Sequence, residues 1–205
     1  MGLPEPARRA EVKQRFLDAA ERLLIEVGHD GITTRGLAEE AGANHGLVHY
    51  YFGSMENLFV EVLERFTNRL IERQRAMYAA DVPFIEKWRA AMGFLEEDLA
   101  SGYPKVQHEL EAMAWNRPHL RERVTRVNAE WRAVLREAFG KALDEYGLDE
   151  ESFPREAVVS LVMTFNQGML IERLAGISDG HAELLAWIDR LLVSLEERRR
   201  RDSDR

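Results

Sequence analysis

Two histidines and two tyrosines stand close together in a stretch of the chain that has no acidic residue. Segment 41–55 contains His45, His49, Tyr50 and Tyr51 and no aspartate or glutamate. Imidazole and phenol groups donate hydrogen bonds, and imidazole also becomes positively charged as the pH falls toward about 6. The whole chain has a formal net charge of −8 at pH 7, so the local absence of carboxylates does not follow from the composition. The segment is suited to lie against a negatively charged partner.

The residues that would indicate catalysis are largely missing. The chain has no cysteine, which excludes disulfides, thiolate metal sites and thiol catalysis. A di-iron bundle needs two Glu-x-x-His pairs on separate helices, and here the single pair, Glu26 and His29, is interrupted by Gly28. An H-E-x-x-H motif, a phosphate-binding glycine loop and a nucleophile elbow are also lacking. His108 and His181 are isolated, and we expect them to be exposed. We therefore expect no enzyme activity, no metal and no cofactor.

The composition is that of a soluble globular protein. The chain has 205 residues, of which 45% are hydrophobic and 31% are charged, and this length can bury a sizeable core. It lacks a signal peptide and an apolar run long enough to span a bilayer, so we expect a cytoplasmic protein without a membrane partner. The acidic net charge argues only mildly against a nucleic-acid partner, because binding depends on where the positive groups lie.

The elements that position the acid-free segment are predicted to be helices. Apolar residues recur at spacings of three and four, and no run alternates apolar and polar residues as a strand would, so we predict an all-α fold. Three short helices lead into a long fourth one, with Gly28 ending the first and with Thr33, Asn44 and Ser54 as the expected N-caps. Prolines that suit a first helical turn divide the rest into predicted helices at Phe84–Ala100, Pro104–Asn116, Pro118–Tyr146, Pro154–Leu174 and His181–Arg200.

A short helix, a turn containing glycine and a second short helix form the helix-turn-helix pattern, whose second helix can enter the major groove of DNA. The stretch TTRGLAEEAGANHGLVHYYFGSMENLF, between an amphipathic helix and a long one, resembles the TetR family of transcriptional regulators. The matching positions are Thr33, Leu37, Ala38, Ala41, Gly42, Gly46, Phe52, Ser54, Glu56 and Leu58. The resemblance covers about the first third of the chain. It implies a helix-turn-helix DNA-binding domain at residues 8–60 and an effector-binding and dimerisation domain, a helical bundle, at residues 61–205.

The resemblance also assigns DNA contacts by matching positions. The residues expected to reach base edges or the groove are His45, Gly46, Leu47 and Tyr50. The residues expected to contact the DNA backbone, and so to position the protein on the duplex, are Thr33, Thr34, Arg35, Asn44, His49, Tyr51 and Ser54. The family usually carries Tyr, His and Lys where this chain has His49, Tyr51 and Met55, which lowers the fixed positive charge. The basic residues that could compensate are Arg8, Arg9, Lys13, Arg15 and Arg35.

The two histidines predict a dependence of DNA binding on pH. Phosphates favour the protonated form of a nearby imidazole, so affinity for operator DNA should strengthen as the pH falls from about 8 to about 6. A binding curve that is flat across this range would contradict the assignment of His45 and His49.

The later helices are expected to hold a small-molecule pocket and to pair two subunits, as the resemblance implies. The expected pocket residues are Trp88, Met92, His108, Met113, Trp115, Trp131, Met163, Phe165, Asn166 and Met169. Such a lining suits an apolar effector with one polar handle, although each of these residues could instead belong to an ordinary core. The expected dimer interface consists of Leu161, Phe165, Leu184, Trp187, Leu191 and Leu195.

The sequence thus predicts a homodimeric, ligand-responsive transcriptional regulator. In this hypothesis it is a repressor, and a small, largely apolar effector releases it from a palindromic double-stranded operator by changing the spacing of its two DNA-binding heads. The alternative is a helical ligand- or partner-binding protein whose head does not bind DNA, since His49 and Met55 replace the expected Tyr and Lys. A gel shift against DNA upstream of the gene separates the two.

Overall fold

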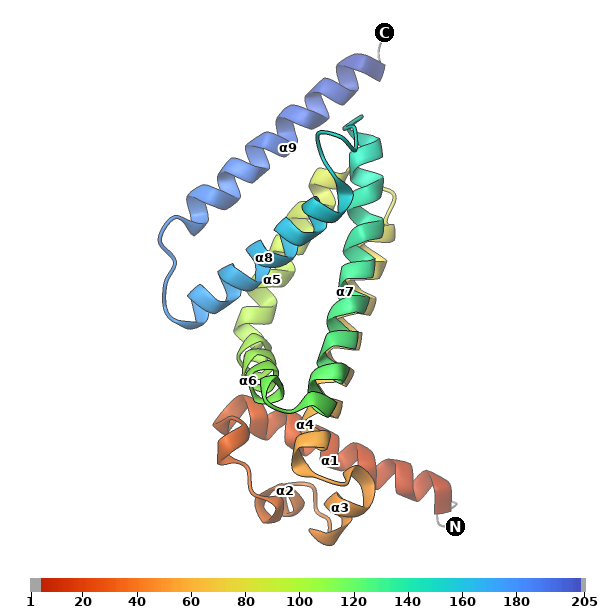
Figure 1. Cartoon of the computed structure of the whole chain (residues 1–205), viewed down its shortest axis with the longest axis vertical. Helices are drawn as coiled ribbons and strands as arrows, with labels where there is room; N and C mark the ends of the chain where they lie inside the picture. Colours follow the sequence, from red (N-terminus) through yellow and green to blue (C-terminus); the bar gives the residue numbers. More distant parts are fainter. Residues whose placement is uncertain (1–4, 204–205) are drawn as a thin grey trace. The chain divides into compact units, whose positions relative to one another are not determined.

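A computed structural model describes residues 5–203, and the regular secondary structure of this range is entirely helical (Figure 1). The elements are α1 (Glu5–Val27), the 3₁₀ helix η1 (His29–Gly31), α2 (Thr34–Glu40), α3 (Gly46–Phe52), α4 (Met55–Ala79), α5 (Phe84–Ser101), α6 (Tyr103–Trp115), α7 (Pro118–Glu145), α8 (Arg155–Leu174) and α9 (His181–Ser203). The predicted all-α fold is confirmed. In the described range, no helix carries an apolar stretch that could cross a membrane.

Local sequence signals set the helix boundaries. Thr33 Oγ1 accepts a hydrogen bond from the backbone N–H of Gly36 at 3.0 Å, which caps α2 as expected. α1 ends at Val27 because Gly28 adopts φ = +71°, a conformation that stops a helix. The predicted ends of the long helices agree with the structure to within one residue, except that α9 continues to Ser203.

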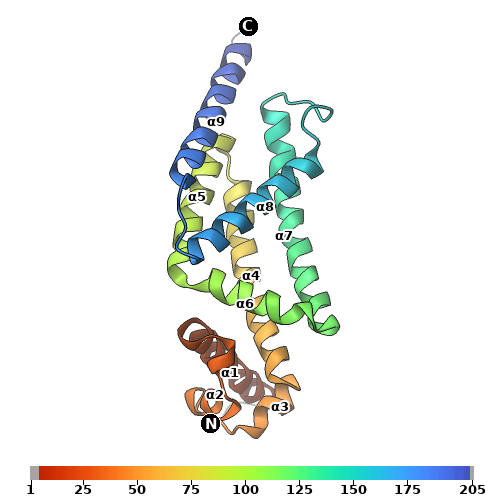
Figure 2. The same ribbon diagram turned by 60° about the vertical axis from the view of Figure 1, so that its left-hand side comes forward.

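The chain forms two compact units. Unit 1 takes in the chain up to Arg69 together with residues 102–127, so α6 and the start of α7 belong with the N-terminal helices. Figures 1 and 2 both show α6 beside α1. The rings of Phe66 and Tyr103 stack at 3.6 Å, and the hydroxyl groups of Thr67 and Tyr103 lie 2.5 Å apart. The helix-turn-helix therefore folds as part of a larger body that includes α6.

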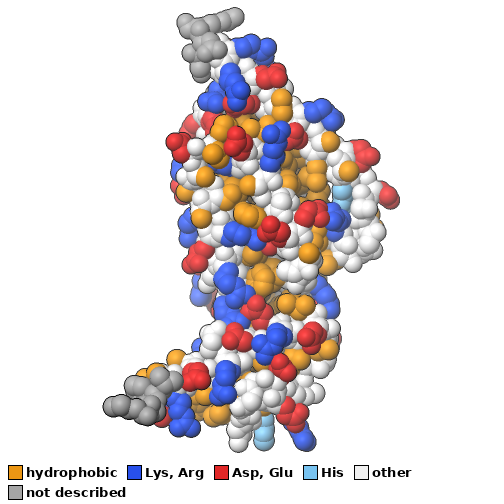
Figure 3. Space-filling model, turned by 180° about the vertical axis from the view of Figure 1, so that it is seen from behind, with side chains coloured by type: hydrophobic (Ala, Val, Ile, Leu, Met, Phe, Trp, Pro, Cys, Tyr) orange, Lys and Arg blue, Asp and Glu red, His pale blue; other side chains and the backbone are white. Residues whose placement is uncertain are grey.

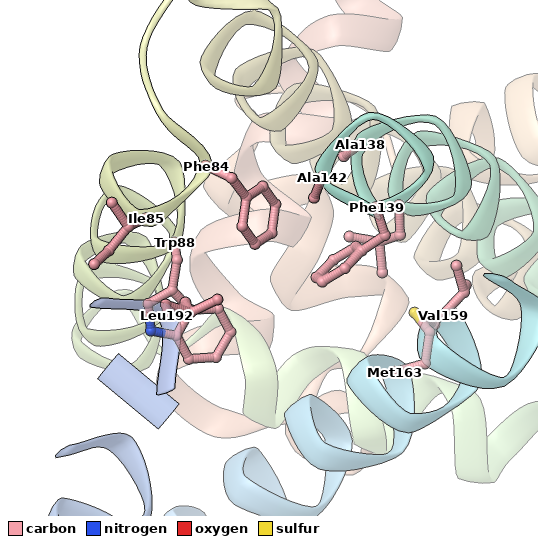
Figure 4. Close-up of a cluster of buried hydrophobic side chains, with 10 residues drawn as sticks. Phe84, Ile85, Trp88, Ala138, Phe139, Ala142, Val159, Met163 and Leu192 are labelled. Atoms are coloured by element: carbon pink, nitrogen blue, oxygen red, sulfur yellow. The ribbon is translucent and has the colours of Figure 1, made fainter. Parts of the chain in front are cut away.

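Unit 2 comprises residues 70–101 and the chain from Asn128 onward. Its core is a cluster of buried side chains from α5, α7, α8 and α9, which converge in Figure 4: Phe84, Ile85, Trp88, Leu135, Ala138, Phe139, Ala142, Val159, Met163 and Leu192. Burial of large apolar groups from all four helices stabilises the unit by the hydrophobic effect. At the surface, Arg89 of α5 and Asp189 of α9 form an ion pair at 2.8 Å.

The boundaries of the two compact units differ from those of the two predicted functional domains, residues 8–60 and 61–205. Helices α4 and α7 each run through both units, and α6 joins unit 1. The assignment of DNA binding to residues 8–60 and of effector binding to residues 61–205 concerns function and stays a prediction. The compact units differ from it because side chains of α6 pack on α1, η1 and α4.

Candidate DNA-binding site

The turn between α2 and α3 is fixed by hydrogen bonds on both sides. Gly42 adopts φ = +57°, which a residue with a side chain rarely does, and this reverses the chain. The N–H of Ala43 donates to the carbonyl of Ala38 at 2.9 Å, and Arg15 of α1 donates from Nη1 to the carbonyl of Gly42 at 3.3 Å. The turn is thus tied to α2 and α1, and these ties set the direction of α3.

Helix α3 has one buried face and one exposed face. Val48 and Phe52 are buried, and the Phe52 ring meets Phe16 of α1 edge-on with 6.2 Å between centroids. Tyr50 points away from this core and is 63% exposed. The other exposed residues of this segment are Asn44, His45, Gly46 and His49, while Leu47 is half-buried. The exposed face contains the residues predicted to contact DNA.

Tyr51 and His49 make contacts within the domain that hold this face in place. Tyr51 is half-buried, with its ring 6.5 Å from Phe16 and 5.0 Å from Tyr50. His49 Nδ1 lies 2.9 Å from the carbonyl oxygen of Gly53. Because a carbonyl only accepts hydrogen bonds, Nδ1 must carry the hydrogen, and this leaves Nε2 for an outside partner.

The predicted backbone-positioning residues cluster at helix N-termini. Asn44 Oδ1 accepts from the N–H of Gly46 at 2.9 Å, and Ser54 Oγ accepts from the N–H of Asn57 at 3.1 Å. Ser54 caps α4 as predicted. The predicted cap of α3 is wrong by one residue: the N-cap position is His45, whose side chain makes no capping hydrogen bond, and Asn44 bonds the N–H of Gly46 from the turn before it. Other N–H groups of these first turns are left available for phosphate oxygens. Thr34 is half-buried at the start of α2.

The N-terminus of α4 begins with Met55, where the family resemblance predicts a lysine, and Glu56 follows it. The backbone N–H of Glu56 lowers the pKa of its own carboxyl below the usual 4.5, burial opposes this shift, and the Ser54 hydroxyl assists it. Arg117 Nη2 lies 4.0 Å from Glu56 Oε1. The ionised carboxylate is favoured at this positive end of the helix dipole.

Acidic and basic side chains are interspersed over the face seen in Figure 3. The basic residues expected to compensate for Met55 also lie near acidic side chains. Three of them pair with glutamates: Arg9 with Glu5 at 3.1 Å, Lys13 with Glu61 at 2.5 Å and Arg35 with Glu39 at 2.9 Å. Arg8 and Arg15 have no carboxylate partner among residues 5–203.

One contact in unit 1 has no local signature in the sequence. Glu109 Oε2 of α6 accepts a hydrogen bond from the backbone N–H of His29 at 3.2 Å and lies 3.3 Å from His29 Nδ1. A Cβ atom on Gly28 would come within 3.0 Å of the same carboxylate oxygen. The partners are 80 positions apart, so no local pattern could indicate the contact.

Comparison with known proteins decides the family. The family description "Bacterial regulatory proteins, tetR family" matches residues 16–62, which extend from α1 through α3 into α4. A transcriptional repressor, AcnR of Corynebacterium glutamicum, is 26% identical over 185 residues, covering 86% of this chain and 90% of AcnR. The DNA-binding region of the chain, at residues 16–62, is that of the TetR family. The chain is a helix-turn-helix transcriptional regulator.

Solved structures show that the TetR fold extends over nearly the whole chain. The fatty acid degradation regulator FadR from Bacillus halodurans superimposes with a TM-score of 0.70 at 16% identity, covering 88% of this chain and 94% of FadR. FadR from Bacillus subtilis, solved in complex with stearoyl-CoA, gives a TM-score of 0.62 at 16% identity, covering 88% of this chain and 97% of that protein. The C-terminal helices are therefore arranged as in TetR regulators.

Seven of the ten predicted pocket residues lie in unit 2. Trp88 and Met163 are buried in the cluster of Figure 4, and Met92, Trp131 and Phe165 pack against it partly buried. Met169 lies in an adjoining cluster that also contacts Met92 and Phe165, while Asn166 is half-buried.

The remaining three predicted pocket residues, His108, Met113 and Trp115, lie on α6 in unit 1. Met113 is buried, and His108 is half-buried with its Nδ1 3.6 Å from Glu111. Trp115 is 70% exposed. A side chain this exposed does not belong to an enclosed lining, and the pocket proposed below leaves it out.

The expectation that His108 and His181 are exposed is wrong. His181 is 7% exposed at the start of α9, where Nε2 lies 2.7 Å from Glu172 Oε2 of α8. Among the described residues, no group of three or more His, Asp or Glu side chains is arranged to hold a metal ion.

Helices α8 and α9 leave large apolar side chains in solvent. Four of the predicted interface residues are exposed: Leu161 at 69%, Leu184 at 38%, Trp187 at 56% and Leu191 at 46%. The other two, Phe165 and Leu195, are partly buried against the core cluster of their own unit. Exposed Ile171 and Leu174 add to the apolar surface of α8. A surface of this kind usually has a partner.

Proposed function

We propose that this TetR-family regulator is a homodimeric, cytoplasmic repressor without enzyme activity. A small, largely apolar effector would release it from a palindromic double-stranded operator. The exposed face of α3 carries the proposal. It bears Tyr50, His45 and His49 in a stretch without carboxylates, as a helix inserted between two rows of phosphates requires.

The apolar faces of α8 and α9 support the dimer. Two-fold pairing of Leu161, Trp187 and Leu191 with their copies would bury side chains that one subunit leaves in solvent. A dimer also presents two recognition helices, so its operator should consist of two inverted half-sites.

The aromatic and Met-rich core of unit 2 supports an apolar effector. Trp88, Met92, Trp131, Met163 and Phe165 would form most of its lining, with Asn166 as the polar handle and Met169 at one side. Methionine side chains are flexible and can repack around a ligand. FadR of Bacillus subtilis, which shares this fold, binds stearoyl-CoA, and long-chain acyl-CoA is therefore the first class of effector to test.

Helices shared by the two units offer a physical route for the response. Helix α4 begins beside α3 and continues into unit 2, and α7 also belongs to both units. These helices would have one arrangement that binds the operator and one that does not. An effector that binds the second arrangement more tightly would lower operator affinity, and the size of this change is limited by the effector's own difference in affinity for the two arrangements.

The DNA-binding part is tested by a gel shift of the full chain against DNA upstream of its own gene. We expect a specific complex that competitor DNA does not remove and whose footprint shows inverted repeats. Failure to bind any upstream fragment, even at about 0.05 M salt where phosphate contacts are strongest, would favour the alternative of a head that does not read DNA.

The effector part is tested by adding stearoyl-CoA, shorter acyl-CoA and free coenzyme A to the preformed complex. An apolar effector predicts release of DNA that grows with chain length and that free coenzyme A does not reproduce. Replacement of Phe165 by Ala should weaken the response and leave DNA binding by the effector-free protein intact. Equal release by all three compounds would contradict an apolar pocket.

A further inference from the structure

A surface hollow of about 390 Å³ lies between α1 and the turn that precedes α3. Its lining consists of Arg8, Glu11, Val12, Arg15, Ala43 and Leu47. The four residues from α1 follow the spacing i, i+3, i+4, i+7 and so share one face of that helix. Since Leu47 belongs to α3, a group that enters the hollow contacts α1 and the recognition helix together.

The uncompensated positive charge of α1 is concentrated in this hollow. Arg9, Lys13 and Arg22 pair with glutamates at 3.1, 2.5 and 2.8 Å, which cancels much of their charge toward a second anion. Arg8 and Arg15 are the basic residues of α1 without a carboxylate partner in the part of the chain that the structure describes, and both line the hollow.

Arg15 is held in place without using up its donors. Its Nη1 donates to the carbonyl of Gly42 at 3.3 Å, which orients the side chain. A guanidinium group has five N–H donors, so others remain for a ligand, and their planar arrangement suits the two oxygens of a phosphate.

Glu11 is the carboxylate of the lining, and it forms no ion pair with another described residue. With two arginines and one glutamate, the hollow has a net charge of +1. Glu11 must repel an anion that enters, so its removal should strengthen binding there.

We propose that the hollow holds a phosphodiester group of the DNA backbone while α3 lies in the major groove. The groove is bordered by phosphates, and in helix-turn-helix domains the helix before the recognition helix crosses the backbone. Here that helix is α2, and the turn that joins it to α3 contributes Ala43 to the hollow, so the hollow lies beside the expected path of the backbone. A phosphate held by Arg8 and Arg15 would replace the backbone contact that Met55 cannot make. The inference rests on DNA binding as proposed above.

Anisotropy of the labelled upstream DNA with the full chain, at salt concentrations from about 0.05 to 0.3 M, tests the proposal. The variant Arg8→Ala should lower the slope of log K against log salt by about 0.9, which corresponds to about fivefold weaker binding at 0.15 M. Arg8 has no hydrogen bond with another described residue, so this variant should fold normally.

Four further variants separate a role in DNA binding from a role in the structure. Arg9→Ala is the matched control, because Arg9 lies outside the hollow and pairs with Glu5, and it should leave the slope unchanged. Glu11→Gln should strengthen binding at every salt concentration, which a merely structural role of this surface would not produce. Arg15→Lys should keep the slope, since the charge remains, whereas Arg15→Ala should lower it.

The outcomes distinguish this inference from the function on which it rests. If the wild-type chain binds no upstream DNA, the DNA-binding proposal fails. If it binds and Arg8→Ala has the slope of Arg9→Ala, the hollow holds no backbone phosphate and the inference alone is wrong. Calorimetry with inorganic phosphate should show no saturation at millimolar concentration. Saturable binding that Arg8→Ala abolishes, without a change in DNA affinity, would assign the hollow to a free anion instead.

Discussion

Tyr50 and Val48 lie two positions apart on α3, and their side chains lie on opposite sides of the helix, one exposed and one buried. Tyr50 is 63% exposed, and its ring rests edge-on against Tyr51 at 5.0 Å, so it is held toward solvent. Val48 is completely buried. The helix thus contributes to recognition on one side and to stability on the other.

Replacement of Tyr50 by Ala should therefore weaken operator binding without unfolding the head. Loss of a groove contact costs about 1–3 kcal/mol, or roughly 5- to 150-fold in affinity, while an exposed substitution changes stability by about 0.5 kcal/mol or less. Anisotropy measures the first quantity and urea unfolding the second. Val48→Ala is the control and should lose about 1–3 kcal/mol of stability through its cavity. Equal stability losses in both variants would show that Tyr50 is core.

At the scale of elements, Gly28 and Glu109 join the end of α1 to α6. Gly28 has φ = +71°, and an added Cβ would meet Glu109 Oε2 at 3.0 Å. Gly147, after α7, has φ = +62° but nothing within 4 Å of such an atom. Both glycines have the positive φ that disfavours a side chain, but only at Gly28 would an added Cβ also meet a neighbouring group.

Gly28→Ala should consequently destabilise the protein more than Gly147→Ala. Both variants incur about 1–2 kcal/mol for a left-handed residue with a side chain, and only the first also displaces the Glu109 carboxylate. Urea unfolding at one protein concentration measures both values. In a Glu109→Ala background the extra loss at Gly28 should disappear. An unchanged loss in that background would mean that the carboxylate plays no part.

The N-terminus of α4 gives a dependence of stability on pH. The backbone N–H of Glu56 lowers the pKa of its carboxyl from 4.5, so the ionised form stabilises the folded state. This contribution is complete above pH 4.5 and is lost as the pH falls through the lowered pKa. Glu56→Gln should cost about 0.3–1 kcal/mol at neutral pH and nothing in acid below the lowered pKa. A cost that stays constant with pH would exclude the helix terminus as its cause.

At the scale of the whole molecule, the exposed apolar faces of α8 and α9 should decide the oligomeric state. Trp187→Glu places a charge on this surface and should weaken the dimer by about 3 kcal/mol, or more than a hundredfold, without loss of helix. Sedimentation velocity measures the dissociation constant. Phe153→Glu is the control, because Phe153 is 42% exposed in the connection between α7 and α8. Equal effects of both variants, or none from Trp187→Glu, would contradict this interface.

Local sequence signals were sufficient for the helices and for the recognition helix. Thr33 and Ser54 cap the helices that they were predicted to cap, and Gly28 ends α1, because capping and left-handed backbone involve residues within a few positions of each other. The acid-free segment and the order of short and long helices then pointed to the helix-turn-helix, and the family match over residues 16–62 agrees with it.

The tertiary structure alone decided which side chains meet across the chain. The contact of Glu109 with His29, the exposure of Trp115 and the burial of His181 all depend on how helices far apart in sequence pack. The sequence named five arginines and lysines as equal candidates for the DNA backbone. Only packing shows that Arg8 and Arg15 share a hollow beside Leu47 while the other three face carboxylates, because a partner's distance is set by the fold and by no local pattern.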